Sequence, residues 1–531
     1  MSRPRLHAPR EHRGVLAVPP LAEAGQLLQA NRARLHAARL DLHGRPLAEL
    51  RRLAGEEVRT AARRYLAALG LSDPGYTSPS FLVTGHQPEL FHPGVWVKNF
   101  AAHGLAAAHG ATPLNLIVDN DTAKVPAVRV PVLGDGPARR VPVPFDRWAG
   151  PMPYEELAVR DEDLFARFPD EVQKTARGLP ADTLLPAFWR EVLVMVPRTP
   201  RLGERLAGAR RRWEETWGCR TLELPVSVLC RTEAFAWFAC HLLADLPRFR
   251  EVYNDGLHAY RERHAVRTPN RPVPELAVRD DWREAPFWVW RAGAAVRERL
   301  FARFAGDAIE LADAAGTFAR LPRRDPPAAV RGWRALEAQG IKLRTRALTA
   351  TLFARLVLAD LFIHGIGGAL YDELTDTLLR EFYRCEPPGF LVLSATLLLP
   401  LGPVPPAGPL PEEVRRQLRD VWYNPDRSLA GNPQRDVADL RRQKWDWIRH
   451  EPADRAGRRE RFRALRTINE QLREFVADRL AALRAKLAEA EKRRETLEVL
   501  QDREYAFCLY PAAELYAFYR QFLSPPGPHA P

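Results

Sequence analysis

The pattern of apolar positions changes near residue 75. Before it, leucines recur among Ala and Arg at roughly the spacing of an amphipathic helix, which predicts a helical segment over 1–74. The short apolar runs 81–85 and 113–118 predict buried strands, and the residues between them predict a loop and then a helix over 95–109. Strand, loop, helix and strand in about 40 residues form a βαβ unit of a parallel sheet, which binds ligands at the carboxyl ends of its strands.

The strand–loop–helix pattern returns in the second half of the chain. Residues 356–363 predict a strand, 364–368 a glycine-rich loop, 369–383 a helix and 389–394 a further buried strand. The proline-rich stretch 400–411 then marks a boundary. We therefore expect the two glycine-bearing loops to meet at one edge of a parallel sheet.

Between these two parts the pattern is mixed. Val, Pro and Arg alternate over 125–145, which predicts edge strands or an extended hairpin. Stretches rich in Leu, Arg and Trp up to about residue 257 predict helices, and 284–290 is a strand candidate. The fold class predicted from these patterns is α/β, with a parallel-sheet core and a helical insertion.

A heptad-like seam marks the C-terminal part. Apolar residues recur at steps of three and four over 472–497, with one gap where Arg494 occupies the seam, and predict a helix over 459–500. Such a helix would be about 60 Å long, so it must pack on a partner helix within the chain or across a dimer. The aromatic stretch 504–522 is expected to dock back on the body.

The chain of 531 residues therefore divides into five segments. The first is an N-terminal helical segment, 1–74. The sheet core comes in two parts, 75–150 and 336–400, separated by an insertion or connecting region, 151–335. The last segment contains the proline-rich connector, the helical arm and the return segment, 401–531.

Composition narrows the class of protein. With 46% hydrophobic and 27% charged residues, wholesale disorder, a collagen-like fibre and a bundle of membrane spans are excluded. The longest apolar stretch, 390–404, is broken by polar residues and prolines. No apolar signal core follows the first residues, and the five cysteines form no CxxC pair. We therefore expect a cytoplasmic protein with reduced thiols and no membrane partner.

The charge suggests an anionic ligand. The net charge is +13, and of the 79 basic residues only seven are Lys. A basic balance suits nucleotides or RNA, but no dense Lys/Arg block with interleaved aromatic residues is present. A small-molecule substrate is therefore expected rather than a nucleic acid.

The first candidate site is the loop between strand and helix, Thr84–Asn99. Backbone N–H groups at a helix N-terminus favour phosphate or carboxylate. His86 and His92 could donate to a developing phosphate charge, and Lys98 could reach the same anion. The alternative is a turn-rich loop whose histidines cap the helix. We expect catalytic roles for His86, Gln87, His92 and Lys98, and substrate or nucleotide contacts for Thr84, Gly85 and Asn99.

The second candidate site repeats this context after residue 363. Glycine clusters often serve only tight packing between a strand and a helix, and acidic residues near a helix start can act as dipole partners. The residues expected to contact substrate or nucleotide are His364, Gly365, Gly367, Gly368, Tyr371 and Asp372.

Two acidic residues follow the second predicted strand. Asp119 and Asp121 could hold Mg²⁺, orient an amine or bind ribose hydroxyls. Alternatively they cap the next turn, as Asp-Asn-Asp sequences often do. No Walker loop, G-x-S-x-G elbow or CxxH-type spacing is present, so no residue is assigned as a metal ligand.

At these residues the chain resembles the bacillithiol-biosynthesis cysteine-adding enzyme family (BshC). The family's TGQQ signature and Gly-Pro loop resemble Thr84–Gln87 and Pro93–Gly94, and its later Gly-Gly-Pro-Gly-Glu and Tyr segment resembles His364–Tyr371. The order of the other parts is also similar, from about residue 75 to 520. Two departures lie at the presumed chemistry: Asp119–Asp121 lacks the family's His, and Ile366–Gly368 replaces its Pro-Gly-Glu.

The resemblance implies a fold and an activity. The fold would be a Rossmann-like nucleotidyltransferase core with a C-terminal coiled coil that makes a homodimer. The activity would be a carbon–nitrogen ligase that joins the cysteine carboxyl, activated beforehand, to the amine of glucosaminyl-malate. Thr84–Gln87 would form the substrate or phosphate loop and Gly367, Gly368 and Tyr371 the opposite wall. The cofactor is open, with ATP or ADP and Mg²⁺ as candidates.

The departures leave two other functions open. One is a nucleotide-binding protein of the same fold without ligase activity, since fold does not imply function. The other is a tRNA- or RNA-binding relative of class I synthetases that uses the basic surface.

Overall fold

A six-stranded sheet forms the centre of the protein. The computed structural model describes residues 6–134, 136–148, 150–268 and 270–524. Five strands of the sheet are parallel, and β1 at one edge is antiparallel to β16. The α/β class and the parallel sheet expected from the sequence are thus confirmed. In spatial order the strands are β1 (Gly14–Val18), β16 (Phe390–Thr396), β15 (Leu361–His364), β4 (Phe81–His86), β5 (Thr112–Ile117) and β8 (Leu222–Pro225).

The order of the parallel strands reverses beside β4. The chain runs outward from β4 through β5 to β8, then returns to the other side of β4 with β15 and β16. Ile363 of β15 is in register with Thr84 of β4, so the loops that follow these two strands leave the sheet at the same edge. Both candidate loops follow strands that flank this reversal. Ligands of open parallel sheets bind at such a position.

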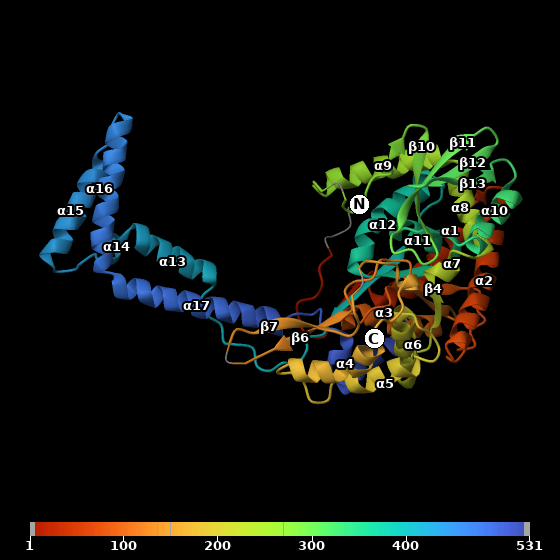
Figure 1. Cartoon of the computed structure of the whole chain (residues 1–531), viewed down its shortest axis with the longest axis horizontal. Helices are drawn as coiled ribbons and strands as arrows, with labels where there is room; N and C mark the ends of the chain where they lie inside the picture. The colour runs from red at the N-terminus through yellow and green to blue at the C-terminus, as the bar shows by residue number, and fades with distance from the viewer. Residues whose placement is uncertain (1–5, 135, 149, 269, 525–531) are drawn as a thin grey trace.

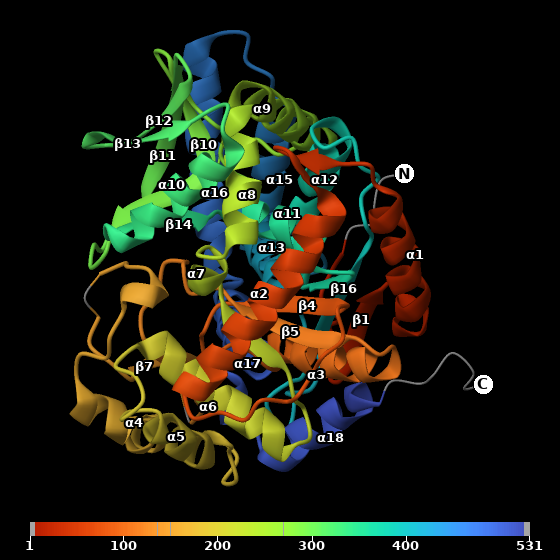
Figure 2. The same cartoon turned by 90° about the vertical axis from the view of Figure 1, so that its right-hand side faces the viewer.

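Helices cover both faces of this sheet. Leu82 is buried in the same cluster as Phe100 of α3 (Pro93–Ala108), whereas Val83 is buried with Val58 of α2 (Leu47–Ala68). Because successive strand residues point to opposite faces, α3 and α2 lie on opposite sides (Figure 2). The other helices of the core are α1 (Ala24–Ala37), α12 (Ile366–Glu381) and α18 (Ala512–Leu523).

The C-terminal return segment docks back on the body, as the sequence predicts, and it contacts α3 there. The Tyr519 hydroxyl on α18 donates a hydrogen bond of 3.0 Å to the Pro93 carbonyl, and the Tyr519 ring stacks on Phe100 with centroids 4.3 Å apart. The last helix of the chain is thereby fixed to the first candidate loop.

The expected helical insertion is helical only in its first half. After its helices the chain forms an antiparallel sheet in the order β13-β12-β11-β10-β14, with β9 paired to β10. Figure 2 shows β10 to β14. On β11, Leu300 and Ala302 are buried and Arg299 is exposed, but Phe301 between the two buried residues is buried as well, so the alternation along this strand is incomplete. The strands are β9 (Val278–Arg279), β10 (Trp282–Arg291), β11 (Glu298–Ala305), β12 (Ala308–Asp313), β13 (Gly316–Pro322) and β14 (Ile341–Thr345).

The helical half of the insertion and the predicted hairpin are present. The strand candidate 284–290 lies within β10, and the region 125–145 forms the antiparallel pair β6–β7. The elements are β6 (Ala127–Val132), β7 (Arg139–Pro144), α4 (Glu162–Thr175), α5 (Leu185–Val194), α6 (Leu202–Thr216), α7 (Val226–Leu229), α8 (Glu233–Ala244), α9 (Leu246–Arg263) and α10 (Pro326–Ala338).

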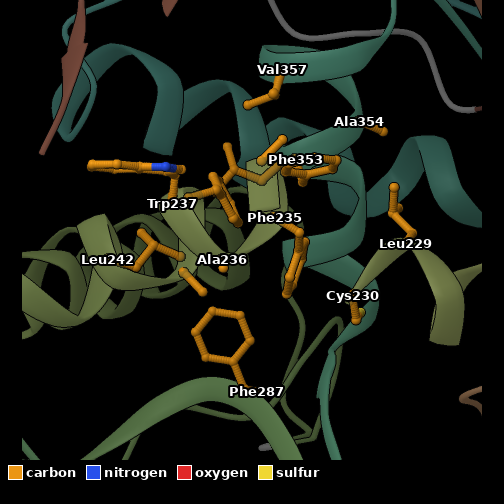
Figure 3. Packing of buried hydrophobic residues seen from close by; sticks show 14 of the residues in the cluster. Leu229, Cys230, Phe235, Ala236, Trp237, Leu242, Phe287, Phe353, Ala354 and Val357 are labelled. Carbon is orange, nitrogen blue, oxygen red and sulfur yellow. The ribbon is translucent and has the colours of Figure 1, made fainter. Parts of the chain in front are cut away.

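An aromatic core joins the second sheet to the helices. Phe235 of α8 lies between Phe287 of β10 and Phe353 of α11 (Ala347–Phe353), with ring centroids 6.2 and 5.3 Å away (Figure 3). All three side chains are fully buried. The second sheet is therefore packed on the body through a continuous hydrophobic cluster.

Two predicted elements differ from the structure. The strand expected over 356–363 is shorter, because residues 354–358 form a π-helical turn after α11 and only Leu361–His364 is extended. Short buried apolar runs do not distinguish helix from strand by periodicity. The segment 1–74 contains the predicted helices, but Gly14–Val18 forms the edge strand β1, and two short strands, β2 (Asp41–Leu42) and β3 (Arg45–Pro46), precede α2.

The C-terminal arm is built from several helices rather than one. The helix expected over 459–500 is interrupted at Phe475–Val476, and Figure 1 shows α16 turned across the outer end of α17. Val421 of α13 is buried with Leu472 and Leu480, so the partner helix comes from this chain. The arm consists of α13 (Pro411–Tyr423), α14 (Pro425–Ser428), α15 (Arg435–Arg449), α16 (Arg455–Glu474) and α17 (Ala477–Leu500).

Arg494, which interrupts the predicted seam, faces α13. Its guanidinium lies 3.2 Å from the carboxylate of Glu412.

Within the described ranges, no helix has both the length and the apolar character that crossing a membrane requires.

Candidate functional site

The two candidate loops are neighbours, but their histidines lie on opposite faces of the sheet. Thr84 of β4 donates a hydrogen bond of 3.2 Å from Oγ1 to the Ile363 carbonyl of β15. His86 extends toward α3 and contacts Asn99, whereas His364 extends toward α12 and contacts Asp372. The loops thus meet at one edge while their imidazoles belong to two separate groups of side chains.

Both ring nitrogens of His86 are engaged within the protein. Nε2 lies 3.2 Å from Oδ1 of Asn99, and Nδ1 lies 3.1 Å from the Gln87 carbonyl. Burial lowers the pKa of His86 well below its usual value, and the charges of Arg210 and Lys98 lower it further. Both nitrogens face oxygen acceptors, and a neutral imidazole can donate to only one of them. The ring must therefore turn before either nitrogen can take a proton from a substrate.

A buried charged network holds the partner of His86. Asn99 donates from Nδ2 to Glu214 at 2.7 Å, and Arg210 donates to Glu214 and to Glu223, both at 2.6 Å. Both glutamates are fully buried. The orientation of His86 therefore depends on ion pairs formed by α6 and β8, more than 100 residues along the chain.

Lys98 is the buried cation of this site that lacks a counter-ion. Only 5% of Lys98 is exposed, and its ammonium donates to the Gly85 carbonyl at 3.0 Å. No carboxylate pairs with it among the residues that the structure describes. Burial lowers the pKa of Lys98 to about 8. Burying an uncompensated ammonium is costly, so this position is suited to an anionic ligand.

His92 caps the helix that follows the loop. Its Nδ1 accepts a hydrogen bond of 3.1 Å from the Gly94 amide, and its carbonyl accepts one of 3.0 Å from the Val95 amide. Pro93 has no N–H, so the first amides of α3 are already satisfied. The alternative that the sequence left open, a histidine that caps the helix, describes this part of the loop, and any anion here would contact side chains rather than these amides.

A second cation, Arg503, reaches the start of α3 from the return segment. Its Nη2 donates to Ser394 Oγ at 3.1 Å and to the Ala395 carbonyl at 3.0 Å, at the carboxyl end of β16. Arg503 also lines a groove of about 650 Å³ together with Arg129 and Arg140 of the β6–β7 pair. No local motif marks Arg503, so the sequence alone does not indicate it as a site residue.

Gly94 is required by packing at this point. A β-carbon at Gly94 would lie 2.0 Å from the Ala395 carbonyl oxygen and 2.8 Å from Arg503 Nη2. We expect Gly94→Ala to lower the free energy of unfolding by about 3 kcal/mol, because a rigid backbone atom blocks the added methyl group. Urea unfolding of the full chain would measure this loss. The matched control is Gly367→Ala, where the β-carbon meets nothing within 4 Å. Equal stability of the two variants would contradict the prediction.

Asp119 and Asp121 have different surroundings. Asp119 accepts hydrogen bonds from the Ser227 amide at 2.8 Å and from the Ser227 hydroxyl, so it caps α7. Burial and the charge of Glu155 raise the pKa of Asp119 to about 7. Asp121, with 40% of its side chain exposed, accepts from Gln87 Nε2 at 3.1 Å.

Arg297, from the loop between β10 and β11, contacts the segment that contains Asp119 and Asp121. Arg297 pairs with Asp121 at 3.1 Å, and its guanidinium lies 4.9 Å from the centre of the Trp288 ring. Arg297 also donates to the Asn120 carbonyl at 2.7 Å. Arg297 lies between β10 and β11, and no motif in the sequence marks it as a site residue.

The second candidate loop contains a buried charged group. His364 Nε2 lies 2.8 Å from Oδ2 of Asp372, and Arg355 donates to the same oxygen at 2.7 Å. Burial opposes ionisation of Asp372, but the charges of Arg355 and His364 outweigh it and hold the pKa of Asp372 below its usual range. Asp372 is therefore a buried ion-pair partner rather than an exposed dipole partner. Tyr371 on the same helix is 37% exposed.

The predicted site residues therefore fall into three groups at one edge of the sheet. The first group lies next to α3 and contains Gly85, His86, His92, Lys98 and Asn99. The second lies at the ends of β4 and β5 and contains Gln87, Asp119 and Asp121; the third lies next to α12 and contains His364, Gly365, Gly367, Gly368, Tyr371 and Asp372, and Thr84 lies between the first and third groups. In the described part of the chain, no three His, Cys, Asp or Glu side chains are placed to hold a metal ion.

Comparison with known proteins gives no assignment. No model of a protein family matches the chain, and no curated protein matches it. The function is therefore argued from the geometry of the site.

Proposed function

We propose that the protein is a carbon–nitrogen ligase similar to the BshC family. It would join the carboxyl group of cysteine, or a similar carboxylate, to the amine of an amino-sugar acceptor such as glucosaminyl-malate. The central sheet would be a Rossmann-like core that binds ATP, with Mg²⁺, where the strand order reverses. Support comes from two glycine-bearing loops that leave neighbouring parallel strands at that position.

The uncompensated ammonium of Lys98 is the observation that carries this proposal. Activation of a carboxylate by a nucleotide places phosphate negative charge beside the acyl carbon. A buried cation without a carboxylate partner stabilises such charge strongly, because little water screens it and the group is already in place. Arg503 adds a second cation nearby, since its charge, like that of Lys98, lowers the pKa of His92.

The proposed reaction has two bond exchanges. First a carboxylate oxygen attacks a phosphorus atom of the nucleoside triphosphate, and the remainder of the nucleotide leaves. The acceptor amine then attacks the acyl carbon, so that the C–N bond forms while the bond from that carbon to the phosphate-bearing oxygen breaks. The amine loses one proton to water. Lys98 would bind the phosphate oxygens in both steps and offset the negative charge on them that opposes the attacking group.

Turnover by the full chain tests this activity. We expect an amide product, detected by mass spectrometry, when cysteine, glucosaminyl-malate, ATP and MgCl₂ are incubated with the protein. Omission of either the amine or ATP should abolish the product. The exposed Lys124, which pairs with Glu89, provides a matched control, because Lys124→Met should retain full turnover. If no product forms and nucleotide cleavage does not depend on the carboxylate, the ligase proposal is wrong.

Asp119 favours a second candidate function, a nucleotide-binding protein without ligase activity. Ser227 occupies both carboxylate oxygens of Asp119, so this residue is not free to orient an amine unless that cap opens. The same position lacks the histidine of the family signature. In that case ATP or ADP would raise the melting temperature of the protein while no amide product appears.

We further propose that the protein is cytoplasmic and forms a homodimer through its C-terminal arm. Its helices expose several large side chains, of which Phe462 is 67% exposed, Tyr423 60% and Trp445 48%. Aromatic residues are enriched in the cores of protein interfaces. We propose that a second copy of this chain covers them.

A further inference from the structure

A polar groove lies where the C-terminal arm joins the body. It has a volume of about 650 Å³, and it is lined by the inner end of α17, the residues that follow this helix and the β6–β7 pair (Figure 1). A groove of this size accommodates a small molecule. The residues that line it are distinct from the predicted site residues at the edge of the central sheet.

Arginines from three separate parts of the chain line this groove. Arg129 and Arg140 come from the two strands of the β6–β7 pair, Arg494 comes from α17, and Arg503 comes from the return segment. A guanidinium group presents its N–H donors as a planar fork that matches the two oxygens of a carboxylate. Because the four groups come from different sides, the groove is suited to a ligand with more than one anionic group.

The protein leaves donors of these arginines unused. Nε of Arg494 and Nε of Arg503 are buried, and within the described ranges neither has a hydrogen-bond partner. The Glu498 carboxylate lies 3.7 Å from Nε of Arg494, and Arg129 lies 3.6 Å from Glu504, so both contacts exceed hydrogen-bond distance. Buried donors are normally satisfied, so acceptor oxygens of a ligand would complete this group of side chains.

The other residues of the groove restrict the ligand further. Glu498, Asp502 and Glu504 also line it, and Asp502 accepts a hydrogen bond of 2.6 Å from Arg140. Such carboxylates accept hydrogen bonds from hydroxyl groups, but they repel the second charge of a phosphate. Among the described residues that line the groove, none is aromatic and only Leu497 is apolar, so a nucleoside base would find no ring to stack on.

We propose that this groove binds a small dicarboxylic acid that also carries hydroxyl groups. The arginines bind the carboxylates of this ligand, and the glutamates at the groove accept hydrogen bonds from its hydroxyl groups. Since the arginines belong to both the arm and the body, the bound ligand connects the two. The site does not depend on the proposed ligase activity, because it involves binding alone.

Isothermal titration calorimetry of the full chain with tartrate tests this site. Tartrate carries both carboxylates and hydroxyl groups, and we expect it to bind saturably at physiological ionic strength. Succinate, which lacks the hydroxyl groups, should bind about tenfold more weakly, and inorganic phosphate at the same concentration should not displace tartrate. Equal binding of succinate, or displacement of tartrate by phosphate, would overturn the proposed ligand class.

Two variants and a control locate the binding in the groove. Arg129→Gln and Arg494→Gln should each weaken tartrate binding about tenfold, because each removes a charge-assisted hydrogen bond. The side chains of Arg129 and Arg494 are 51% and 43% exposed, so the melting temperature should change little. The matched control is Arg324→Gln, at an exposed arginine between β13 and α10 that pairs with Asp307, and it should bind tartrate normally.

The outcomes separate this site from the proposed ligase. Absence of saturable binding by the unchanged protein, or normal binding by both groove variants, would overturn the site. Intact tartrate binding that the groove variants weaken would support it even when no amide product forms, and that result would reject only the ligase.

Discussion

Replacement of Lys98 by methionine is expected to stabilise the protein and to abolish ligase turnover. Lys98 is 5% exposed and has no carboxylate partner among the described residues, and burial lowers its pKa from 10.5 to about 8. A shift of this size corresponds to about 3 kcal/mol of destabilisation at neutral pH. Loss of the hydrogen bond to Gly85 offsets about 1 kcal/mol. Lys98→Met should therefore raise the free energy of unfolding by about 2 kcal/mol, although it removes the cation that the chemistry requires.

The pH dependence of this effect has a defined sign. Between pH 8 and 10.5 the folded protein releases the Lys98 proton while the unfolded chain retains its own. The unfolded state then binds more protons, so the contribution of Lys98 to stability rises with pH through this window. Below pH 8 both states are protonated and the full cost is present. The advantage of Lys98→Met should consequently be largest at pH 7 and nearly absent at pH 10.5.

Urea unfolding at pH 7 and at alkaline pH, combined with the turnover assay, measures both effects. The difference between variant and unchanged protein isolates Lys98 from other groups that titrate at high pH. Lys124→Met, at a lysine whose side chain is 78% exposed, should change stability by less than about 1 kcal/mol. A destabilised Lys98→Met, or one with normal turnover, would show that Lys98 serves the fold alone.

Arg210→Met is expected to cause the largest loss of stability. Arg210 is 4% exposed and pairs with two carboxylates, Glu214 and Glu223, whose side chains are at most 1% exposed. Removal of the guanidinium leaves both carboxylates buried without a cation, which typically costs about 3–5 kcal/mol. The contact from Glu214 through Asn99 to His86 would loosen at the same time.

Acidic pH should partly restore the stability that Arg210→Met loses. Burial already raises the pKa of Glu223, and loss of the Arg210 charge would raise it further. A carboxyl group with a raised folded-state pKa contributes stability that is complete below its unfolded pKa and is lost as pH rises through the folded value. Arg210→Met should therefore unfold at higher urea concentration at pH 5 than at pH 8. Arg212→Met is the matched control, because Arg212 is 38% exposed and pairs with Glu191 at the surface. A loss within 1 kcal/mol for Arg210→Met would contradict the prediction.

The elements predicted correctly are those with a strong local pattern. The strands at 81–85, 113–118 and 389–394 and the helix after the first loop all appear within a few residues of the expected bounds. Each is specified by apolar residues close together in sequence and by a nearby glycine or proline. The strand β1 was missed because its pairing partner β16 lies almost 400 residues away. Most of the sheet β9–β14 was missed, although 284–290 predicted β10, because β11 buries the consecutive residues Leu300, Phe301 and Ala302 and so does not alternate strictly.

By itself the sequence determined the parallel βαβ units, the two glycine-bearing loops and the residue types that they carry. Only the tertiary structure decided which charges are neutralised. Lys98 and Lys444 are both buried lysines on helices, but Lys444 contacts the carboxylate of Asp426, whereas Lys98 donates to the Gly85 carbonyl and pairs with none of the described carboxylates. Likewise only the folded chain shows that a side chain, that of His92, caps α3, whereas none of the described side chains caps α12. Electrostatic energy depends on distance through space, and spacing along the chain does not fix that distance.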